Sequence, residues 1–436
     1  MMLDVLFAIG LLLSPASQLR PAGSPIGPGE ICLLIWIVLM LGREAARGGP
    51  PLTPALSRLV IFWSLFVVAQ SLGTLMAFSI GDEHDPHWFL HDVMAYPLLA
   101  AASCLSVIEP HAGLRLHRVA WLLCALGTPL LALQFANAWG LINISSIDPW
   151  YWDQMLRGWS ANPHQLAVLC TVLGLLSLHL AETAVRPRER IAAVACAILP
   201  IYAGRLTKSD SFSVVLVVAG PIFVAIKFRT WLVSFAPRIT LRSAFAWIIV
   251  LALPLVLVST APFGSLIAVE AEGFAREMSR ENYERTEQKT ELRLHLWRQA
   301  IVRGVESGML GLGPGPHLEI PSSILAGRQG MATRPKYVEH PEPNFAPNFE
   351  AHNTLLDLFI QGGLIAVLSF VWLAATALFI TYRARLAGLS TLLCGLAVYG
   401  VATLIIRHPI FWFAIALCLV AGTGAVRPSV VRDWSQ

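Results

Sequence analysis

Apolar runs of about the length that crosses a lipid bilayer recur along most of this chain. About twelve of them are predicted as transmembrane helices, at approximately 3–18, 29–42, 58–80, 90–108, 118–139, 162–181, 190–205, 210–227, 243–262, 353–381, 387–406 and 409–426. Charged residues make up only 13% of the sequence, too few to cover a large soluble protein. The sequence therefore predicts an all-α, polytopic integral membrane protein with a single membrane domain over residues 1–436.

The first apolar run admits a second interpretation, a cleaved signal peptide. No Lys or Arg precedes its apolar part, and Asp4 stands where a signal peptide carries positive charge. We therefore interpret residues 3–18 as a membrane span.

Lys and Arg gather in the connections that follow even-numbered spans. Examples are Arg43 with Arg47, Arg186 with Arg188, and Arg383. By the positive-inside rule these connections face the cytoplasm, and so do both termini. The long segment 263–351, inserted between spans nine and ten, is then an extracytoplasmic loop.

Five cations break this pattern because they fall at the outer ends of spans. They are Arg20, Arg157, Arg205, Lys208 and Arg407. Such residues are costly at the edge of a bilayer and are functional candidates by default. Each alone could simply extend its charge to the outer headgroups, but as a group they favour a shared anionic ligand.

The predicted outer loop begins with a segment of helical composition, 275–307. Its apolar residues Leu294, Trp297, Ile301 and Val305 form a narrow stripe at helical spacing. This pattern predicts a charged amphipathic helix that lies across the outer mouth of the bundle, although a plain solvated helix has the same composition.

The remainder of the loop is glycine-rich and then proline-rich. Residues 308–316 (GMLGLGPGP) lack the GK[ST] of a phosphate loop and are predicted as a tight turn, and residues 317–351 are predicted to be irregular. Asn353 follows as the predicted N-cap of the tenth span.

Binding of nucleic acid and of metal is not expected from the sequence. The basic residues are dispersed rather than gathered in one stripe, and no CxxC spacing occurs among the cysteines. His87 and His91 have the i, i+4 spacing of a metal pair, with Asp82, His84 and Asp85 nearby. A short polar outer loop is the simpler interpretation, so we predict no metal and no cofactor.

Three motifs, in this order, resemble those of the O-antigen ligase and polysaccharide polymerase superfamily of bacterial envelopes. They are SANPHQLAVL (160–169), RLHLWRQAI with GMLGLGPG (293–315), and AHNTLLDLFIQGGLIAVLSF (351–370). The single large outer loop before the HN motif matches as well, so the resemblance covers most of the chain from about residue 155.

The resemblance implies a membrane glycosyltransferase of the bacterial inner membrane with its active site on the periplasmic face. Its donor would be a glycan on undecaprenyl diphosphate and its acceptor a sugar hydroxyl, with other polysaccharide-assembly proteins as possible partners. His352 is then the candidate general base and Arg293 a catalytic cation. Arg205, Lys208 and Arg407 are candidates for binding the diphosphate.

Four further residues are supporting candidates, namely Asn353, His164, His408 and Arg157. Asn353 could orient the base or only cap the helix. One departure from the family concerns Asp210 in TKSDS, which occupies the position where family members commonly carry an arginine. Lys208 or Arg205 would then have to supply that charge.

The competing functions remain open at this stage. We favour a polymerase that extends a lipid-linked glycan, with inverting and metal-independent chemistry. The first alternative is a ligase that moves the glycan to lipid A-core. A transporter or flippase is the second, but the two similar halves typical of such folds are not evident in the sequence.

Overall fold

The computed structural model describes residues 1–21, 26–48, 52–82, 86–109, 111–144, 147–151, 154–234, 280–321 and 345–421. The chain divides into two compact units. The first comprises Met1–Phe223, Gln299–Leu318 and the chain from Asn348 onward, and the second comprises Val224–Arg298 and Glu319–Pro347. The first unit contains the helical bundle and all the geometry described below, unless stated otherwise.

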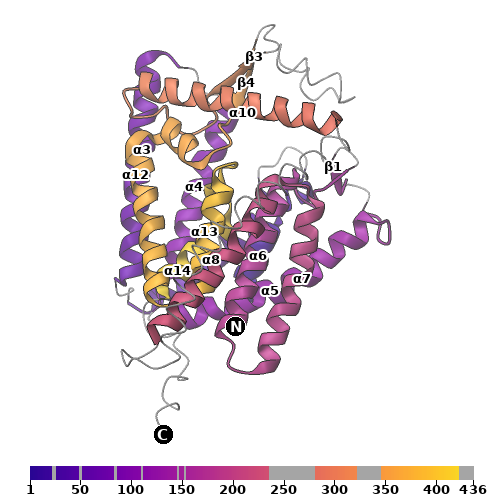
Figure 1. Ribbon diagram of the computed structural model, residues 1–436. Helices are drawn as coiled ribbons and strands as arrows, with labels where there is room; N and C mark the ends of the chain where they lie inside the picture. The colour runs from indigo at the N-terminus through magenta and orange to yellow at the C-terminus, as the bar shows by residue number, and fades with distance from the viewer. Residues whose placement is uncertain are drawn as a thin grey trace. The chain divides into compact units, whose positions relative to one another are not determined.

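Helices dominate the described residues (Figure 1). They are α1 (Met2–Leu13), α2 (Pro28–Ala46), α3 (Pro54–Ile80), α4 (Pro86–Ser106), α5 (Ala112–Ala138), α6 (Pro163–Thr183), α7 (Pro187–Leu206), α8 (Asp210–Ser234), α10 (Arg280–Glu306), α12 (Thr354–Arg383), α13 (Ala387–Gly400) and α14 (Pro409–Val420). Two 3-10 helices, η1 (Ser17–Leu19) and η2 (Ile405–Arg407), are shorter. Strands β1 (Trp150–Tyr151) and β2 (Met155–Leu156) pair antiparallel, and β3 (Leu318–Pro321) pairs with β4 (Phe345–Phe349).

Every predicted span except the ninth coincides with a helix of the structure, while the ninth, 243–262, lies outside the described residues. Six of the described helices are long and apolar enough to cross a membrane by length and composition, namely α3, α4, α5, α6, α8 and α12. The prediction of a helical membrane protein is thus supported, and the count of twelve spans stays a prediction.

Helices α3 and α6 each begin with a capping side chain followed by proline. The hydroxyl of Thr53 accepts from the amide of Leu56 at 3.2 Å before Pro54 opens α3. Asn162 does the same for Gln165 at 3.0 Å where Pro163 opens α6. These caps satisfy amides that have no partner within the helix. The local sequence therefore determines where α3 and α6 begin.

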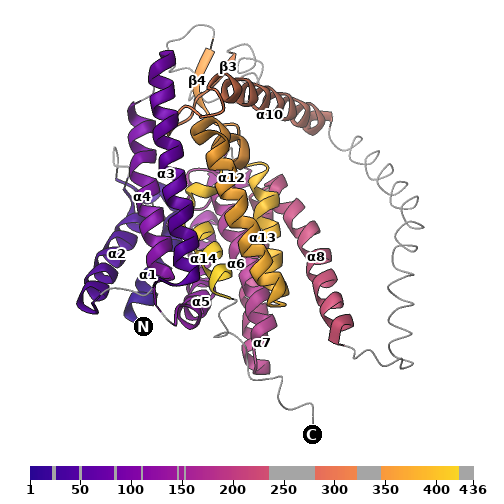
Figure 2. The ribbon, with the colours of Figure 1, turned by 90° about the vertical axis from the view of Figure 1, so that its left-hand side faces the viewer.

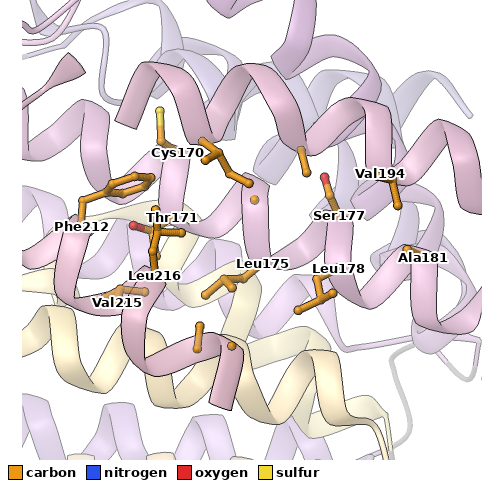
Figure 3. Close-up of a pocket in the computed structure, with 15 residues that line it drawn as sticks. Cys170, Thr171, Leu175, Ser177, Leu178, Ala181, Val194, Phe212, Val215 and Leu216 are labelled. Carbon is orange, nitrogen blue, oxygen red and sulfur yellow. The ribbon is translucent and has the colours of Figure 1, made fainter. Parts of the chain in front are cut away.

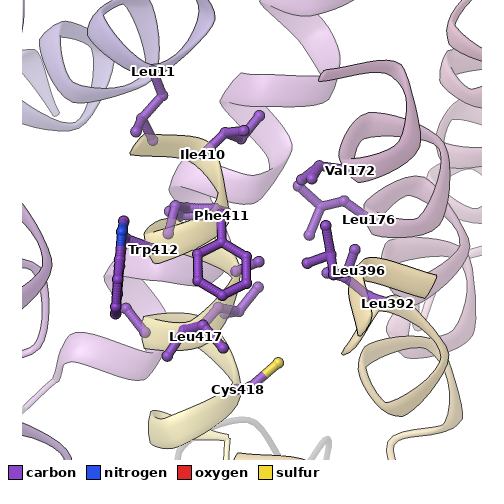
Figure 4. Packing of buried hydrophobic residues seen from close by; sticks show 14 of the residues in the cluster. Leu11, Val172, Leu176, Leu392, Leu396, Ile410, Phe411, Trp412, Leu417 and Cys418 are labelled. Carbon is purple, nitrogen blue, oxygen red and sulfur yellow. The ribbon is translucent and has the colours of Figure 1, made fainter. Parts of the chain in front are cut away.

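Helix α14 lies at the centre of the bundle. Every residue from Ile410 to Val420 is buried, and α14 packs against helices that include α4, α5, α6, α12 and α13. Figure 4 shows Phe411, Trp412 and Leu417 of α14 among side chains of α1, α6 and α13. A helix that is apolar on all sides is a core helix. Its 12 residues rise only about 18 Å, so it is shorter than the hydrocarbon layer.

Helices α3 and α12 lie side by side (Figure 2), and α12 contains a break. Gly362 and Gly363 leave helical geometry there, and Gly363 has φ 60° and ψ −157°, a region open essentially to glycine alone. The break frees backbone groups of α12 from their helical partners. Groups of another segment take the place of those partners.

The glycine-rich segment 308–316 supplies those partners. The amide of Leu312 donates to the carbonyl of Ile360 at 2.6 Å, and that of Gly313 donates to Gln361 at 2.8 Å. Leu364 donates in return to the carbonyl of Met309 at 3.0 Å. The tight turn predicted for this segment is confirmed, since Gly308, Gly311, Gly313 and Gly315 all have positive φ.

Three expectations need correction. Helix α13 ends at Gly400 instead of reaching residue 406. A side chain at Gly400 would lie 3.2 Å from both Ile405 and Thr354, so both residues pack closely against the helix end. The segment predicted as irregular contains β3 and β4.

The third correction concerns the apolar stripe of α10. The helix forms as predicted, but Leu294, Ile301 and Val305 are 56%, 50% and 51% exposed, whereas Leu296 and Ala300 are fully buried. Near the end of the helix, a side chain at Gly304 would collide with the ring of Phe359 on α12. The buried face of α10 is thus the row Leu292, Leu296, Ala300 and Gly304, spaced by four, and not the predicted stripe.

Candidate active site

The turn that precedes α12 holds His352 in an unusual conformation. Its φ is 52°, in the left-handed region, which costs a non-glycine residue about 1–3 kcal/mol. The carboxylate of Asp357 accepts from the amide of Ala351 at 2.7 Å and from that of Asn353 at 3.1 Å. Asp357 therefore bonds the residues on both sides of His352, and the strained turn is held from within the helix.

Asn353 is the N-cap of α12, as predicted. Its side-chain oxygen accepts from the amides of Leu355 at 3.0 Å and Leu356 at 3.3 Å. The side chain of His352 itself is exposed at this helix start. The imidazole of His352 is thus held on a rigid turn at one end of the helical bundle. We call this end of the bundle the His352 end.

A second segment, 403–408, is fastened to the same turn. The hydroxyl of Thr354 donates to the carbonyl of Thr403 at 2.6 Å and accepts from the amide of Ile405 at 3.1 Å. Arg407 follows two residues later, and its guanidinium forms ion pairs with Glu350 and, at 2.5 Å, with Asp92 of α4. Arg407 thus joins the loop before α12 to α4, with its charge compensated by two carboxylates.

His408 lies beside Arg407 at the start of α14. Burial lowers the pKa of His408 to about 4, although the carboxylate of Glu350 acts in the opposite direction. A histidine with this pKa is neutral near pH 7, so His408 contributes no cation to the site under ordinary conditions.

A cluster of polar side chains gathers where α7 meets α8. Nδ1 of His164 lies 3.3 Å from the hydroxyl of Ser209, which lies 3.3 Å from the hydroxyl of Tyr399 on α13. The Tyr399 hydroxyl donates to the carbonyl of His164 at 3.1 Å. The predicted resemblance of 160–169 to a functional motif thus falls on residues that contact the α7–α8 turn.

The α7–α8 turn also carries two of the candidate cations. Lys208 has φ 51°, the same strained region as His352, and its side chain is exposed. Arg205 is exposed and donates from Nη1 to the hydroxyl of Ser213 at 2.7 Å. Asp210 begins α8 and is exposed as well, so a carboxylate accompanies the two cations at this turn.

The end of α13 connects the two clusters. Tyr399 contacts His164 and Ser209, while the next residue, Gly400, packs against Thr354 at the start of α12. His352, Arg407 and the α7–α8 turn therefore belong to one continuous end of the bundle. The structure brings these predicted site residues together from four separate stretches of sequence.

Arg157 and Arg293 are placed differently. Arg157 donates to the carbonyls of Asp148 at 2.9 Å and Ala161 at 3.3 Å and pairs with the Asp148 carboxylate at 2.7 Å. It therefore orders the loop before α6. Arg293 lies on α10 within the second compact unit and is half-buried.

The acidic residue considered for a metal site, Asp82, pairs with other side chains. Its Oδ1 lies 3.4 Å from Nη1 of Arg303, and Oδ2 lies 3.5 Å from Nδ1 of His317. Arg303 also donates to the carbonyl of His317 at 2.8 Å. His84 and Asp85 lie outside the described residues.

Sequence reasoning missed the residues that position the others. Asp357, Glu350 and Tyr399 make contacts that only the fold brings together. Two signals were present: an acidic residue in the first turn of a helix, as at Asp357, favours contacts with helix-start amides, and Asp92 is an ionisable residue inside a predicted span.

These features define a class, a multi-pass helical membrane protein with cationic and imidazole side chains gathered at one end of its bundle. Residues 195–371 match the family model described as O-antigen ligase, in agreement with the resemblance that the motifs indicate. The match includes Arg205, Lys208, Arg293 and His352, whereas Arg407 lies beyond it. It supports a membrane glycosyltransferase in general terms. Among curated proteins, none matches this chain.

Proposed function

We propose that this protein is a polysaccharide polymerase that transfers a glycan from undecaprenyl diphosphate to a sugar hydroxyl. The observation that carries the proposal is the His352 turn. An exposed histidine is held in a strained conformation by Asp357, within the segment that matches the O-antigen ligase family. Strain of this kind is retained where surrounding contacts over-determine it, commonly at functional sites.

The reaction needs one proton transfer and one good leaving group. The acceptor hydroxyl attacks the anomeric carbon and forms the new C–O bond, while the bond from that carbon to the diphosphate oxygen breaks. His352 takes the hydroxyl proton, since an imidazole with an ordinary pKa of about 6.5 can act as a base near neutral pH. With no enzyme nucleophile, the anomeric centre inverts.

The cations stabilise the charge that builds on the leaving diphosphate. Arg205 and Lys208 carry exposed side chains on the α7–α8 turn and supply this charge in the proposal. Arg293, in the second compact unit, is a candidate catalytic cation on the family resemblance alone. Fixed positive charges near a low-dielectric membrane face can contribute a few kcal/mol to such a step. Arg407, paired with Asp92 and Glu350, orders the loop that carries His352. The proposed chemistry requires no divalent metal.

The test uses purified protein in detergent with an oligosaccharide on undecaprenyl diphosphate. A polymerase lengthens the lipid-linked glycan, and chelator leaves the rate unchanged. Transfer only to a lipid A-core acceptor would indicate the ligase instead. No transport can be scored in detergent, so absence of transfer to either acceptor from a folded sample would reject the glycosyltransferase and favour the flippase.

The proposed location is the bacterial inner membrane, with both termini in the cytoplasm and the His352 end on the periplasmic face. The positive-inside pattern of the connections supports this orientation. A reporter that is active only in the cytoplasm, fused after residue 330, should be silent. Strong activity there would reverse the orientation and with it the proposed access to the acceptor.

A further inference from the structure

The imidazole of His164 is exposed at the end of the bundle that carries the candidate cations. It follows Pro163, which opens α6, and its Nδ1 lies 3.3 Å from the hydroxyl of Ser209. Ser209 comes directly after Lys208, whose amide donates to the carbonyl of Arg205 at 3.1 Å. The contact with Ser209 therefore holds the His164 ring beside the α7–α8 turn, to which the proposed reaction assigns the diphosphate.

Two buried hydroxyl groups continue from the His164 ring into the bundle. Ser209 and Tyr399 are 2% and 0% exposed, their hydroxyl oxygens lie 3.3 Å apart, and Tyr399 reaches the carbonyl of His164 at 3.1 Å. The interior next to them is apolar, since Figure 3 shows Phe212, three residues after Ser209, lining a pocket with Cys170. Because they are buried, these hydroxyl groups depend on this hydrogen-bonded row for their partners.

The positions of the protons in the row follow from its carbonyl end. A carbonyl oxygen can only accept, so the Tyr399 hydroxyl donates its one proton to the carbonyl of His164. The Ser209 hydroxyl then donates to the Tyr399 oxygen, since otherwise two oxygens would face each other with no proton between them. The Ser209 oxygen accepts in turn from Nδ1 of His164. Neutral His164 is therefore the tautomer with its proton on Nδ1 and a lone pair on Nε2.

We propose that Nε2 of His164 donates a proton to the leaving diphosphate, as the acid that complements the base His352. This rests on the proposed function, which assigns the diphosphate to Arg205 and Lys208. The bound anionic donor favours the imidazolium form of His164, in which Nε2 also carries a proton. As the bond from the anomeric carbon to the diphosphate oxygen breaks, its electron pair stays on that oxygen, which takes the Nε2 proton.

The hydrogen-bonded row matches this direction of proton transfer. Loss of the Nε2 proton leaves His164 in the neutral tautomer that Ser209 and Tyr399 already hold, so no other proton in the row has to move. His352 ends the step with the proton of the acceptor hydroxyl, and exchange of one proton with water at each imidazole restores both residues. A diphosphate can leave without a proton, but the added proton neutralises part of the charge that builds on it.

The experiment measures the single-turnover rate of glycan transfer as a function of pH, between about pH 6 and about pH 9, for the parent and His164→Asn. The asparagine amide can still donate to Ser209 but cannot transfer a proton. We expect His164→Asn to be slower than the parent by about a hundredfold at the acidic end. The ratio of the two rates should shrink toward alkaline pH, where the parent loses its imidazolium.

His111→Asn is the matched control. His111 is exposed and precedes α5 at the end of the bundle that carries Glu109, so this variant should keep the parent rate and pH profile. A structural role of His164 predicts instead a loss of the same size at every pH. Such a constant loss, or a folded His164→Asn protein with the parent rate, would overturn the proposal.

A measurement on the protein alone separates this inference from the proposed reaction. With isotopically labelled histidine, the NMR signals that vanish in His164→Asn belong to His164 and report which ring nitrogen carries a proton. We expect the Nδ1–H tautomer in the neutral parent, and protons on both nitrogens after addition of excess inorganic pyrophosphate at constant pH. Tyr399→Phe should favour the Nε2–H tautomer, because the Ser209 proton is then available to Nδ1.

These NMR results together with no glycan transfer would support a proton-donating site for pyrophosphate and would reject only the proposed reaction. The Nε2–H tautomer in the folded parent would overturn the inference, whatever the transfer rate. An imidazole of His164 that stays neutral with excess pyrophosphate would overturn it as well.

Discussion

The two ends of the helical bundle both carry arginines but hold them in different ways. At the end opposite His352, Glu109 pairs with three of them: Arg43, Arg47 at 3.1 Å and Arg115 at 3.1 Å. Arg115 is buried and also donates to two backbone carbonyls, of Leu105 at 3.1 Å and Ser106 at 2.8 Å. We call this the Glu109 end.

The His352 end keeps part of its charge available. Arg205 and Lys208 are exposed, and both Lys208 and His352 occupy strained backbone conformations. Arg407 is the exception, since Asp92 and Glu350 compensate it as Glu109 compensates Arg115. The comparison teaches that the position of an arginine at a membrane edge does not by itself indicate a functional role. Its ion-pair partners must be known, because an arginine whose charge is compensated by carboxylates stabilises the fold.

The largest expected effect on stability is at the Glu109 end. Glu109→Gln removes the carboxylate shared by three arginines and leaves buried Arg115 without its ion pair, so unfolding free energy should fall by roughly 3 kcal/mol. Thermal unfolding in detergent measures this. Glu189→Gln, in a surface pair with Arg186 at 3.9 Å, is the control and should change stability by less than about 0.5 kcal/mol. Equal, small effects of both would remove the contrast between the two ends.

A comparable loss is expected where the glycine-rich segment meets α12. A Cβ at Gly363 would lie 2.0 Å from the carbonyl oxygen of Met309, in a backbone region that only glycine occupies freely. Gly363→Ala should therefore cost about 2–3 kcal/mol of stability and lower turnover, since the break supports the start of α12. Gly42→Ala, with open space around it, should be neutral or slightly stabilising. A Gly363→Ala protein with the stability of the parent would contradict the proposed dependence of α12 on its contact with the glycine-rich segment 308–316.

Removing the exposed cations should affect the donor and spare the fold. Arg205→Gln and Lys208→Gln are each expected to raise the donor KM about tenfold, the equivalent of one charged contact to phosphate of roughly 1.4 kcal/mol. Arg188→Gln, an exposed arginine at the other end of α7, is the matched control and should leave KM unchanged. If all three variants behave alike, the cations of the α7–α8 turn have no special role.

The smallest effect concerns pH. Because the pKa of His408 is lowered to about 4, the unfolded chain, with an ordinary value near 6.5, binds a proton more readily than the folded protein below neutral pH. Stability should thus fall as pH drops below about 6.5, by about 1 kcal/mol at pH 5.5. Thermal unfolding of His408→Asn over the same range should lack this component. An unchanged pH profile in His408→Asn would show that other groups titrate.

The positions of the helices follow from the sequence because apolar runs of fixed length leave few alternatives in a membrane protein. Asn353 was predicted as a cap for a similarly local reason, since its side chain reaches amides two and three residues away. Local physics thus accounts for the helix starts and for the tight glycine-rich turn.

What could not be predicted depends on contacts between distant segments. The pairing of Arg407 with Asp92 joins residues 315 positions apart, and Gly304 marks the buried face of α10 only because Phe359 packs against it. The hydrogen bonds from the amides of Ala351 and Asn353 to Asp357 depend on the left-handed backbone of His352. No periodic pattern in the sequence indicates that conformation. The sequence therefore predicts a set of candidate site residues. Only the structure distinguishes the residues that carry available charge from those that position other side chains.

The most direct test of the account is the single-turnover rate of glycan transfer by purified His352→Gln. Glutamine can supply a comparable hydrogen bond at this exposed position but cannot take up a proton near neutral pH. The account predicts unchanged thermal stability and a rate reduced about a hundredfold or more, the usual loss for a positioned general base. A folded His352→Gln protein that transfers glycan at the parent rate would contradict it.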